Sequence, residues 1–275
     1  MKRSLTIAAA ALLLASGAAS ASTIQYGMNA AATSTTLHGG NREMISMGFN
    51  SNPTVFNGGN FLNFTDGSLT NNVGTFGWTA PIPRDMNGSN NNSGNPDRAD
   101  SASAYTGEGG STGTLAEVFG PFGSGYKNLS YIIDGEDNGS WVLDLLFAPG
   151  QTLSADASNS TIELAVLERG RNSDFNIYGI TAGRTFTAPV FVPRANVTAA
   201  GWTLDTLEID GAQNVGGVGL SLDSSWTNLI GFRIQSQSAF NGPDIVAIAT
   251  ASPIPAPSSI ALLSLGGLFA KRRRR

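Results

Sequence analysis

The sequence predicts an all-β protein: an antiparallel β-sandwich of jelly-roll type, with a signal helix at the N-terminus and a short hydrophobic helix at the C-terminus. Apolar and polar residues alternate in short runs, and Gly, Asn, Asp and Pro separate these runs. Between the two ends, no window shows a sustained apolar stripe at helical spacing. The 275 residues include no cysteine, which excludes disulfides, thiolate metal sites and cysteine nucleophiles. Stability must therefore come from burial of a core.

The first 21 residues have the layout of a secretory signal. Two cations precede an apolar stretch at residues 5–15, and the small residues Ala19 and Ala21 then offer a cleavage site. We expect cleavage before Ser22 and export through the Sec machinery. One β-sandwich domain is then expected to span residues 22–252.

Short alternating runs within this domain predict its strands. The clearest run is 141–147, where Trp141 and Leu143 share one face and Asp144 lies on the other. The other candidates are residues 44–49, 61–64, 129–133, 161–168, 177–181, 185–192, 202–209, 218–223, 229–236 and 245–250. The sequence leaves the order of the strands open.

One region, about residues 84–125, interrupts the rhythm of strands. It is rich in Asn, Ser and Gly and has few residues that could fill a core. We expect a long mobile loop or an insertion with little structure. Two interpretations remain open: a surface loop without a function of its own, and a loop that binds a partner.

Residues 253–275 form a segment of a different kind. Prolines open it, an apolar run at residues 258–270 follows, and Lys271 begins a basic end. The apolar run of roughly 13 residues would form a helix of about 20 Å, whereas a span normally needs about 20 residues. The processing residues of interest are Pro255, Ala256, Pro257, Arg272, Arg273, Arg274 and Arg275. The terminal cations favour a short, transient insertion in the inner membrane with the tip in the cytoplasm.

This tail resembles the PEP-CTERM sorting signal, with Ala256 where the family usually has Glu. The resemblance implies a bacterial envelope protein and an exosortase as partner, a membrane enzyme that removes the tail during export. It further implies a final location at the cell surface or outside the cell, in a bacterium that makes exopolysaccharide.

Removal of both ends would leave an acidic protein. The signal holds two and the tail five of the 16 Lys and Arg residues, which leaves nine against 20 Asp and Glu, or about −11. Lys127 is then the remaining lysine. Such a surface repels nucleic acid and attracts divalent cations, so nucleic-acid binding is not expected.

Residues 134–139 resemble the opening of a calcium loop. Asp134, Glu136 and Asn138 would supply oxygen ligands, and Gly139 would allow the turn. Leu145 stands where a closing Glu would be needed. A structural Ca²⁺ and a simple turn between two strands both remain open.

Other residues that could bind a metal or take part in catalysis lack the partners that such a site requires. His38 is the single histidine, so a multi-histidine metal site is excluded. Glu208 and Asp210 resemble the start of the motif of laminarinase-type glycosidases, but the second Glu of that motif is missing. An Arg of residues 168–174, between acidic neighbours at the end of a strand, is expected to pair with a carboxylate and fix the adjoining loop. Contact with an acidic sugar is the alternative.

Three stretches, residues 134–138, 167–174 and 231–244, resemble those of exosortase-dependent surface proteins. The resemblance implies a non-catalytic surface protein and assigns no functional residue. We therefore expect a structural or interaction role associated with exopolysaccharide. One alternative is a carbohydrate-binding domain, with sugar rings stacked on one of the tryptophans at positions Trp78, Trp141, Trp202 and Trp226. Packing in the core or on a strand face is the other interpretation of these tryptophans, and the one we favour. A glycoside hydrolase or lyase is the second alternative.

Overall fold

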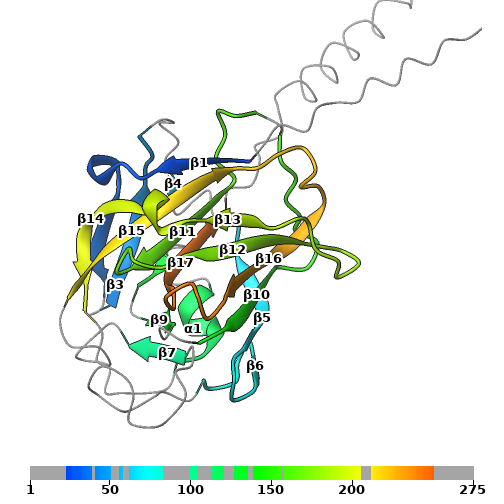
Figure 1. The fold of residues 1–275 in the computed structure, drawn as a ribbon, viewed down its shortest axis with the longest axis horizontal. Helices are drawn as coiled ribbons and strands as arrows, with labels where there is room; N and C mark the ends of the chain where they lie inside the picture. Colours follow the sequence, from blue (N-terminus) through cyan, green and yellow to red (C-terminus); the bar gives the residue numbers. More distant parts are fainter. Residues whose placement is uncertain are drawn as a thin grey trace, which may run out of the picture.

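The computed structural model of the chain describes residues 23–38, 41–50, 56–57, 62–82, 100–103, 113–120, 127–129, 131–135, 139–156, 158–205 and 212–250. These residues lie mostly in antiparallel strands, so the predicted all-β class is confirmed (Figure 1). No helix within these ranges is long and apolar enough to cross a membrane. The predicted signal helix and C-terminal helix lie outside the described residues.

The first sheet faces solvent on one side. Its six strands have the order β13 (Val190–Val192), β12 (Phe175–Thr181), β16 (Leu229–Ser236), β10 (Trp141–Phe147), β5 (Phe64–Thr70) and β6 (Thr75–Gly77). In Figure 1, β12, β16, β10 and β5 follow one another down the right side. Trp141 and Leu143 in β10 are buried, whereas Val142 and Asp144 are half-buried. This alternation is what the sequence predicts for a sheet with one wet face.

The central strands of the second sheet are buried on both faces. Its seven strands are β1 (Ile24–Gly27), β15 (Gln213–Ser221), β11 (Leu164–Arg169), β17 (Asp244–Thr250), β9 (Tyr131–Asp134) and β7 (Asp100–Ser103), with β14 (Thr198–Leu204) beside β15. Every residue of β11 and β17 is buried. Their nearly continuous apolar runs follow from this, because neither face of these strands meets water.

A third, smaller sheet covers the far face of the second one. It consists of β2 (Ser34–His38), β3 (Asn41–Met47) and β4 (Phe56–Asn57), with β8 (Lys127–Asn128) also paired to β3. The predicted strand at 44–49 overlaps β3, but the sequence did not predict the layer. The apolar residues of β2, β3 and β4 are few, and β8, which pairs with β3 from a distant part of the chain, consists of Lys127 and Asn128.

Two hydrophobic clusters hold the layers together. The larger one joins the six-stranded and seven-stranded sheets and includes Phe64, Trp141, Phe175 and Phe232 from the first and Leu164, Val166, Val218 and Ile245 from the second. The smaller one joins the seven-stranded sheet to the third and includes Met44, Met47, Phe49 and Phe56 against Ala165, Leu167, Val246 and Ala249. Side chains of this size gain about 1.5–3 kcal/mol each on full burial, so the two clusters explain how the chain folds without cysteine.

Helix α1 (Leu115–Phe119) and β7 are the elements described inside the predicted loop at 84–125. Thr114 caps the helix: its hydroxyl accepts from the backbone N–H of Glu117, and the Glu117 carboxylate accepts from the backbone N–H of Thr114. Leu115, Val118 and Phe119 are buried in the larger cluster. The other residues of that predicted loop lie outside the described ranges.

Strand β5 lies later in the chain than the predicted strand. The prediction covers residues 61–64 and stops before Asp66 and Gly67, which are typical turn residues. The strand instead runs from Phe64 to Thr70 and pairs with β10 and β6. A side chain at Gly67 would place its Cβ 2.4 Å from the Asp144 carbonyl oxygen. Glycine is present there for close packing within the sheet, not for a turn.

The predicted run at 185–192 is only partly a strand. Phe186 makes an isolated bridge to Ile180, and β13 begins at Val190. The strands predicted at 161–168, 202–209 and 218–223 are shifted: β11 begins at Leu164, β14 ends at Leu204 and β15 begins at Gln213.

Candidate functional site

Two regions of the domain gather chemically active side chains. The first, the acidic cluster, consists of Asp134, Glu168, Arg169 and Asp244 at adjoining strand ends of the seven-stranded sheet. The second, the aromatic face, is the solvent-facing side of the six-stranded sheet with Tyr178, Phe186, Phe191, Arg233 and Asp144.

The acidic cluster is enclosed in protein. Arg169 and Asp244 are partners in the register of β11 and β17, and the guanidinium Nη1 lies 3.3 Å from Asp244 Oδ2. Asp244 Oδ1 accepts from the backbone N–H of Gly135 at 2.9 Å. Arg169 Nε donates to the Leu204 carbonyl at 3.1 Å. Arg169 is 0% exposed and Asp244 6%, so the pair is screened from water. The predicted pairing of an Arg in residues 168–174 with a carboxylate is met by Arg169, and the partner comes from a strand 75 residues away.

Loop contacts extend the cluster outward. Ser173 Oγ donates to the Asn241 carbonyl at 2.6 Å, and the backbone N–H of Asp174 donates to the Phe240 carbonyl at 2.9 Å. Arg194 Nη2 bonds to Asp174 Oδ2 at 2.8 Å. The loop after β11 is thereby tied to the loop before β17. Parts of the three stretches that carry the second resemblance, separated in sequence, thus meet at one end of the sheet.

Burial dominates the electrostatics of this cluster. It raises the pKa of Glu168 to about 8, although a bond of 2.6 Å from the backbone N–H of Arg171 to Oε2 acts in the opposite direction. Burial, followed by repulsion from Asp134, raises the pKa of Asp244 well above its ordinary value. The low-dielectric site therefore favours protonated carboxyl groups at neutral pH, and Asp134 and Asp244 share a hydrogen bond.

The calcium prediction is only partly covered by the structure. Asp134 is 1% exposed and faces the acidic cluster, whereas Glu136 and Asn138 lie outside the described residues. Among the residues that are described, no three His, Cys, Asp or Glu side chains are arranged to hold a metal ion. The segment from Asp134 to Trp141 is also not a hairpin, because β9 and β10 belong to different sheets.

The remaining predicted residues are spread over the chain. His38 ends β2, where its backbone pairs with Asn41. Glu208 and Asp210 lie outside the described residues, as do all the predicted signal-cleavage and tail-processing residues.

The tryptophans are used for packing. Trp141 and Trp226 are each 1% exposed inside the larger cluster. Trp78 is half-buried against that cluster, and Trp202 is half-buried against the smaller one. The two fully buried rings cannot be sugar platforms in the folded protein.

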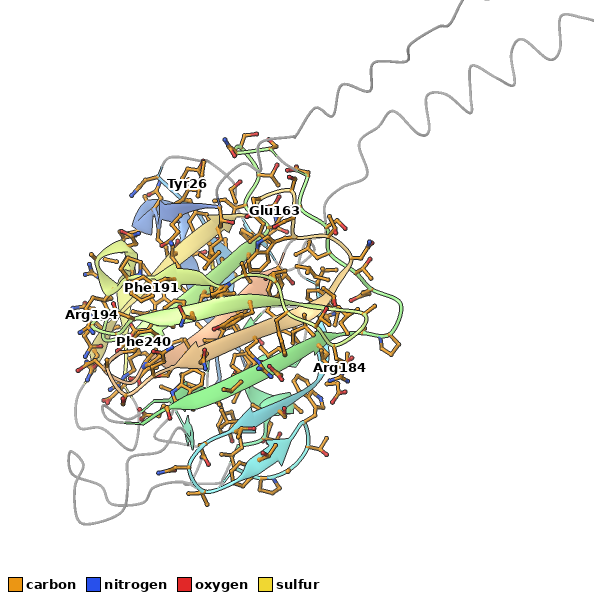
Figure 2. The ribbon with its side chains drawn as sticks, turned by 45° about the vertical axis from the view of Figure 1, so that its right-hand side comes forward. Tyr26, Glu163, Arg184, Phe191, Arg194 and Phe240 are labelled. Carbon is orange, nitrogen blue, oxygen red and sulfur yellow. The ribbon has the colours of Figure 1, made fainter. Side chains whose placement is uncertain are left out.

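Exposed aromatic rings are found instead on the six-stranded sheet. Three large apolar side chains are exposed among the described residues, and two of them, Phe186 at 43% and Phe191 at 48%, lie on this face. Phe191 also contacts Phe240, with ring centroids 5.6 Å apart. Figure 2 shows Phe191, Phe240 and Arg194 near one another, with Arg184 toward the other end of the sheet. No sequence motif marks Phe186 or Phe191, although alternation in 177–181 does place Tyr178 outward.

A polar row crosses three strands of the aromatic face. Tyr178, Arg233 and Asp144 are register partners on β12, β16 and β10. The guanidinium of Arg233 binds Asp144 through two bonds of 2.6 and 2.8 Å, and these bonds raise the pKa of Arg233. Its Cζ lies 4.0 Å from the centroid of the Phe186 ring. Tyr178 Oη donates to Gln235 Oε1 at 2.9 Å. These contacts hold the polar groups in fixed directions.

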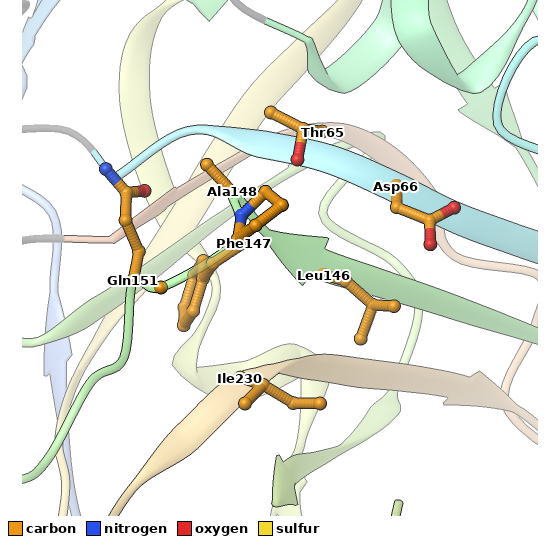
Figure 3. Close-up of a pocket in the computed structure, with 9 residues that line it drawn as sticks. Thr65, Asp66, Leu146, Phe147, Ala148, Gln151 and Ile230 are labelled. Carbon is orange, nitrogen blue, oxygen red and sulfur yellow. The ribbon is translucent and has the colours of Figure 1, made fainter. Parts of the chain in front are cut away.

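A hollow of about 300 Å³ adjoins this row (Figure 3). Leu146 and Ile230 line it, and Thr65, Asp66 and Gln151 add polar groups. Asp66 and Leu146 are register partners, and Leu146 is two residues from Asp144 on β10. The hollow therefore lies on the same face of the sheet as the polar row, two residues further along β10.

Comparison of the chain with family models, with curated proteins and with solved structures gives no match to any of them.

Proposed function

We propose that the chain is an exported bacterial cell-surface or matrix protein whose domain has a non-catalytic interaction role associated with exopolysaccharide. The observation that carries the proposal is the aromatic face, an exposed surface of fixed polar groups and open rings. Exposed apolar side chains gathered on one face mark an interaction site. On an exported protein, the partner at this site would be a polymer outside the cell.

The use of the charged residues supports a non-catalytic role. The three ion pairs Arg169 with Asp244, Arg194 with Asp174 and Arg233 with Asp144 each join different elements of the fold. Their carboxylates are thus engaged in holding strands and loops together. Release of reducing ends from a polysaccharide panel, lost in Glu208→Gln, would contradict this role and favour a glycoside hydrolase.

We further infer a jelly-roll-like sandwich for the two larger sheets. The pairings β9 with β17, β10 with β16, β11 with β15 and β12 with β13 are nested, as if one long hairpin of four strand pairs were rolled up. Successive strands from β9 to β12 alternate between the two sheets, which is what rolling such a hairpin requires. The third sheet would be an addition to this core. Lectin domains are among the proteins with this architecture, an analogy at the level of fold only.

Export through Sec and sorting by an exosortase fit the limits of the described strands. Strand β1 begins at Ile24 and β17 ends at Thr250. Cleavage before Ser22 and removal of the tail near Pro257 would therefore cut into no described strand.

Fractionation and intact-mass analysis test the proposal. The full chain is expressed in a bacterium that has an exosortase, beside the same strain without it. We expect a species lacking residues 1–21 and the tail, at the surface or in the medium, in the first strain only. A matched variant with Gln at Arg272, Arg273, Arg274 and Arg275 should keep its tail and stay in the inner membrane. An unprocessed chain in the inner membrane of the first strain would overturn the proposal.

A further inference from the structure

We propose that the aromatic face binds an extended, neutral polysaccharide chain along strand β12. This inference rests on the proposed surface role, because it names the class of ligand that the domain would meet there. Phe191, Tyr178 and Phe186 would stack on sugar rings, and the polar row would bind hydroxyl groups.

The rings form a line parallel to the strand. Phe191 is the register partner of Asn176, and Phe186 bridges to Ile180, so the two residues flank positions four residues apart on β12. At about 3.3 Å per residue these positions are about 13 Å apart, with Tyr178 midway between them. A line of rings of this length suits several successive units of an extended chain.

Local bonds fix the ring of Phe186 in place. The chain turns back after β12, with Thr181 N–H donating to the Thr185 carbonyl at 2.9 Å and Thr187 N–H to the Gly179 carbonyl at 3.0 Å. The ring then lies over the Arg233 guanidinium and meets Tyr178 edge to face, with centroids 6.3 Å apart. Because these contacts hold the ring while it is still 43% exposed, little side-chain entropy remains to be lost on binding.

The chemistry of the face matches a sugar ring better than a protein surface. A pyranose offers apolar C–H groups on its faces and hydroxyl groups at its edge. The exposed phenyl rings can stack on the C–H groups of the sugar. Gln235 and the carboxylate of Asp144 can bond to its hydroxyl groups, because these planar groups can each make two hydrogen bonds at once. The hollow beside Asp144 leaves room for a substituent of the chain.

The balance of charge favours a neutral polymer. The described part of the face and its edges carries three carboxylates and three guanidinium groups: Asp66, Asp144 and Asp174 against Arg184, Arg194 and Arg233. Two of these guanidinium groups are already bonded to carboxylates of the same set. An anionic chain would meet no net positive charge on this surface, and the domain as a whole is acidic.

Native affinity electrophoresis of the purified full-length chain tests the site. The gels contain cellulose oligomers, mannan or dextran as neutral probes, or alginate or polygalacturonate as anionic probes. We expect retardation by at least one neutral probe, with an affinity that changes little between low and high salt. Phe186→Ala and Phe191→Ala should each weaken binding about tenfold, the loss of one stacking contact of about 1.4 kcal/mol. Phe186→Tyr, which keeps the ring, should bind as the parent does.

A matched control removes an exposed apolar side chain elsewhere. Val73 is 53% exposed and precedes β6, at the opposite edge of the sheet from β13. Val73→Ala should leave the affinity unchanged.

Several outcomes would overturn the site. These are the absence of binding to every neutral probe, binding to the anionic probes alone, or unchanged affinity in both phenylalanine variants. Sedimentation supplies a further outcome: a dimer of the parent that Phe186→Ala dissociates would assign the face to a second copy of the chain. Because the assay uses purified protein, failed export or sorting would overturn the proposed function without altering this result.

Discussion

The acidic cluster and the aromatic face use charged residues in opposite ways. In the cluster, Arg169 is 0% exposed and is surrounded by more carboxyl groups than it can neutralise. On the face, Arg233 has one carboxylate in bidentate geometry, and both side chains keep contact with water. The same residue types therefore support the fold in one place and shape a surface in the other.

The comparison shows that conspicuous sequence patterns need not mark the binding surface. The motif-like stretches around Glu168 and Asp244 supply the cluster, which ties loops to strand ends. The face is assembled from single residues of several strands, and of its five residues only Arg233 lies in one of the motif-like stretches. Many neighbouring residues must match to form a buried polar network. An exposed ring requires only a position on the outward side of a strand or of the segment beside it.

The largest expected difference between the two regions is in stability. Arg169→Met should lower the free energy of unfolding by about 3–5 kcal/mol, because the buried carboxyl groups lose their cation. Part of this loss should disappear at pH 5, where those groups are protonated more readily. Urea denaturation at pH 5 and pH 8 measures both effects.

Arg233→Met is the matched control on the face. Its partner Asp144 can be solvated when the guanidinium is removed, so we expect a loss under about 1 kcal/mol. Equal losses of stability in Arg169→Met and Arg233→Met would mean that burial does not set how much each ion pair contributes.

Alternation was sufficient to predict the strands of the six-stranded sheet where one face is wet, as in β10 and β16. It predicted a strand at 44–49, which overlaps β3, but not the third sheet as a layer, whose strand β4 is only two residues long. Local sequence predicted that an Arg of residues 168–174 pairs with a carboxylate, but the identities of Arg169 and Asp244 depend on register between distant strands. For the tryptophans the sequence left core packing and a sugar platform open, because size and aromatic character do not reveal which face of a strand meets the core.

The second prediction concerns pH. Glu168, with its pKa raised to about 8, and Glu163, raised by burial to about 7, hold protons in the folded state that the unfolded chain releases near its ordinary value of 4.5. Stability from these groups is therefore fully present below about pH 4.5 and is lost as pH rises through 7 to 8. Each group should contribute a decline on the order of 2 kcal/mol between pH 5 and pH 8.

Glutamine variants isolate the two contributions. In Glu168→Gln the decline should shrink across the whole range up to pH 8, whereas in Glu163→Gln it should shrink mainly below pH 7. Chemical denaturation at half-unit intervals of pH measures the slopes. A parent protein whose stability rises steadily from pH 5 to pH 8 would contradict the raised pKa of both carboxyl groups.

The smallest expected effect is the most informative about function. Phe186→Ala removes a ring that is 43% exposed and rests on Arg233, so we expect the free energy of unfolding to change by under about 1 kcal/mol. Phe175→Ala, on the buried side of β12, should cost about 3–5 kcal/mol. Thermal and urea unfolding of the two variants make the comparison. If Phe186→Ala is as costly as Phe175→Ala, the ring is part of the core and its exposure needs no ligand. If it is nearly neutral while binding falls tenfold, the exposed ring contributes to contact with a partner outside the chain and not to the stability of the fold.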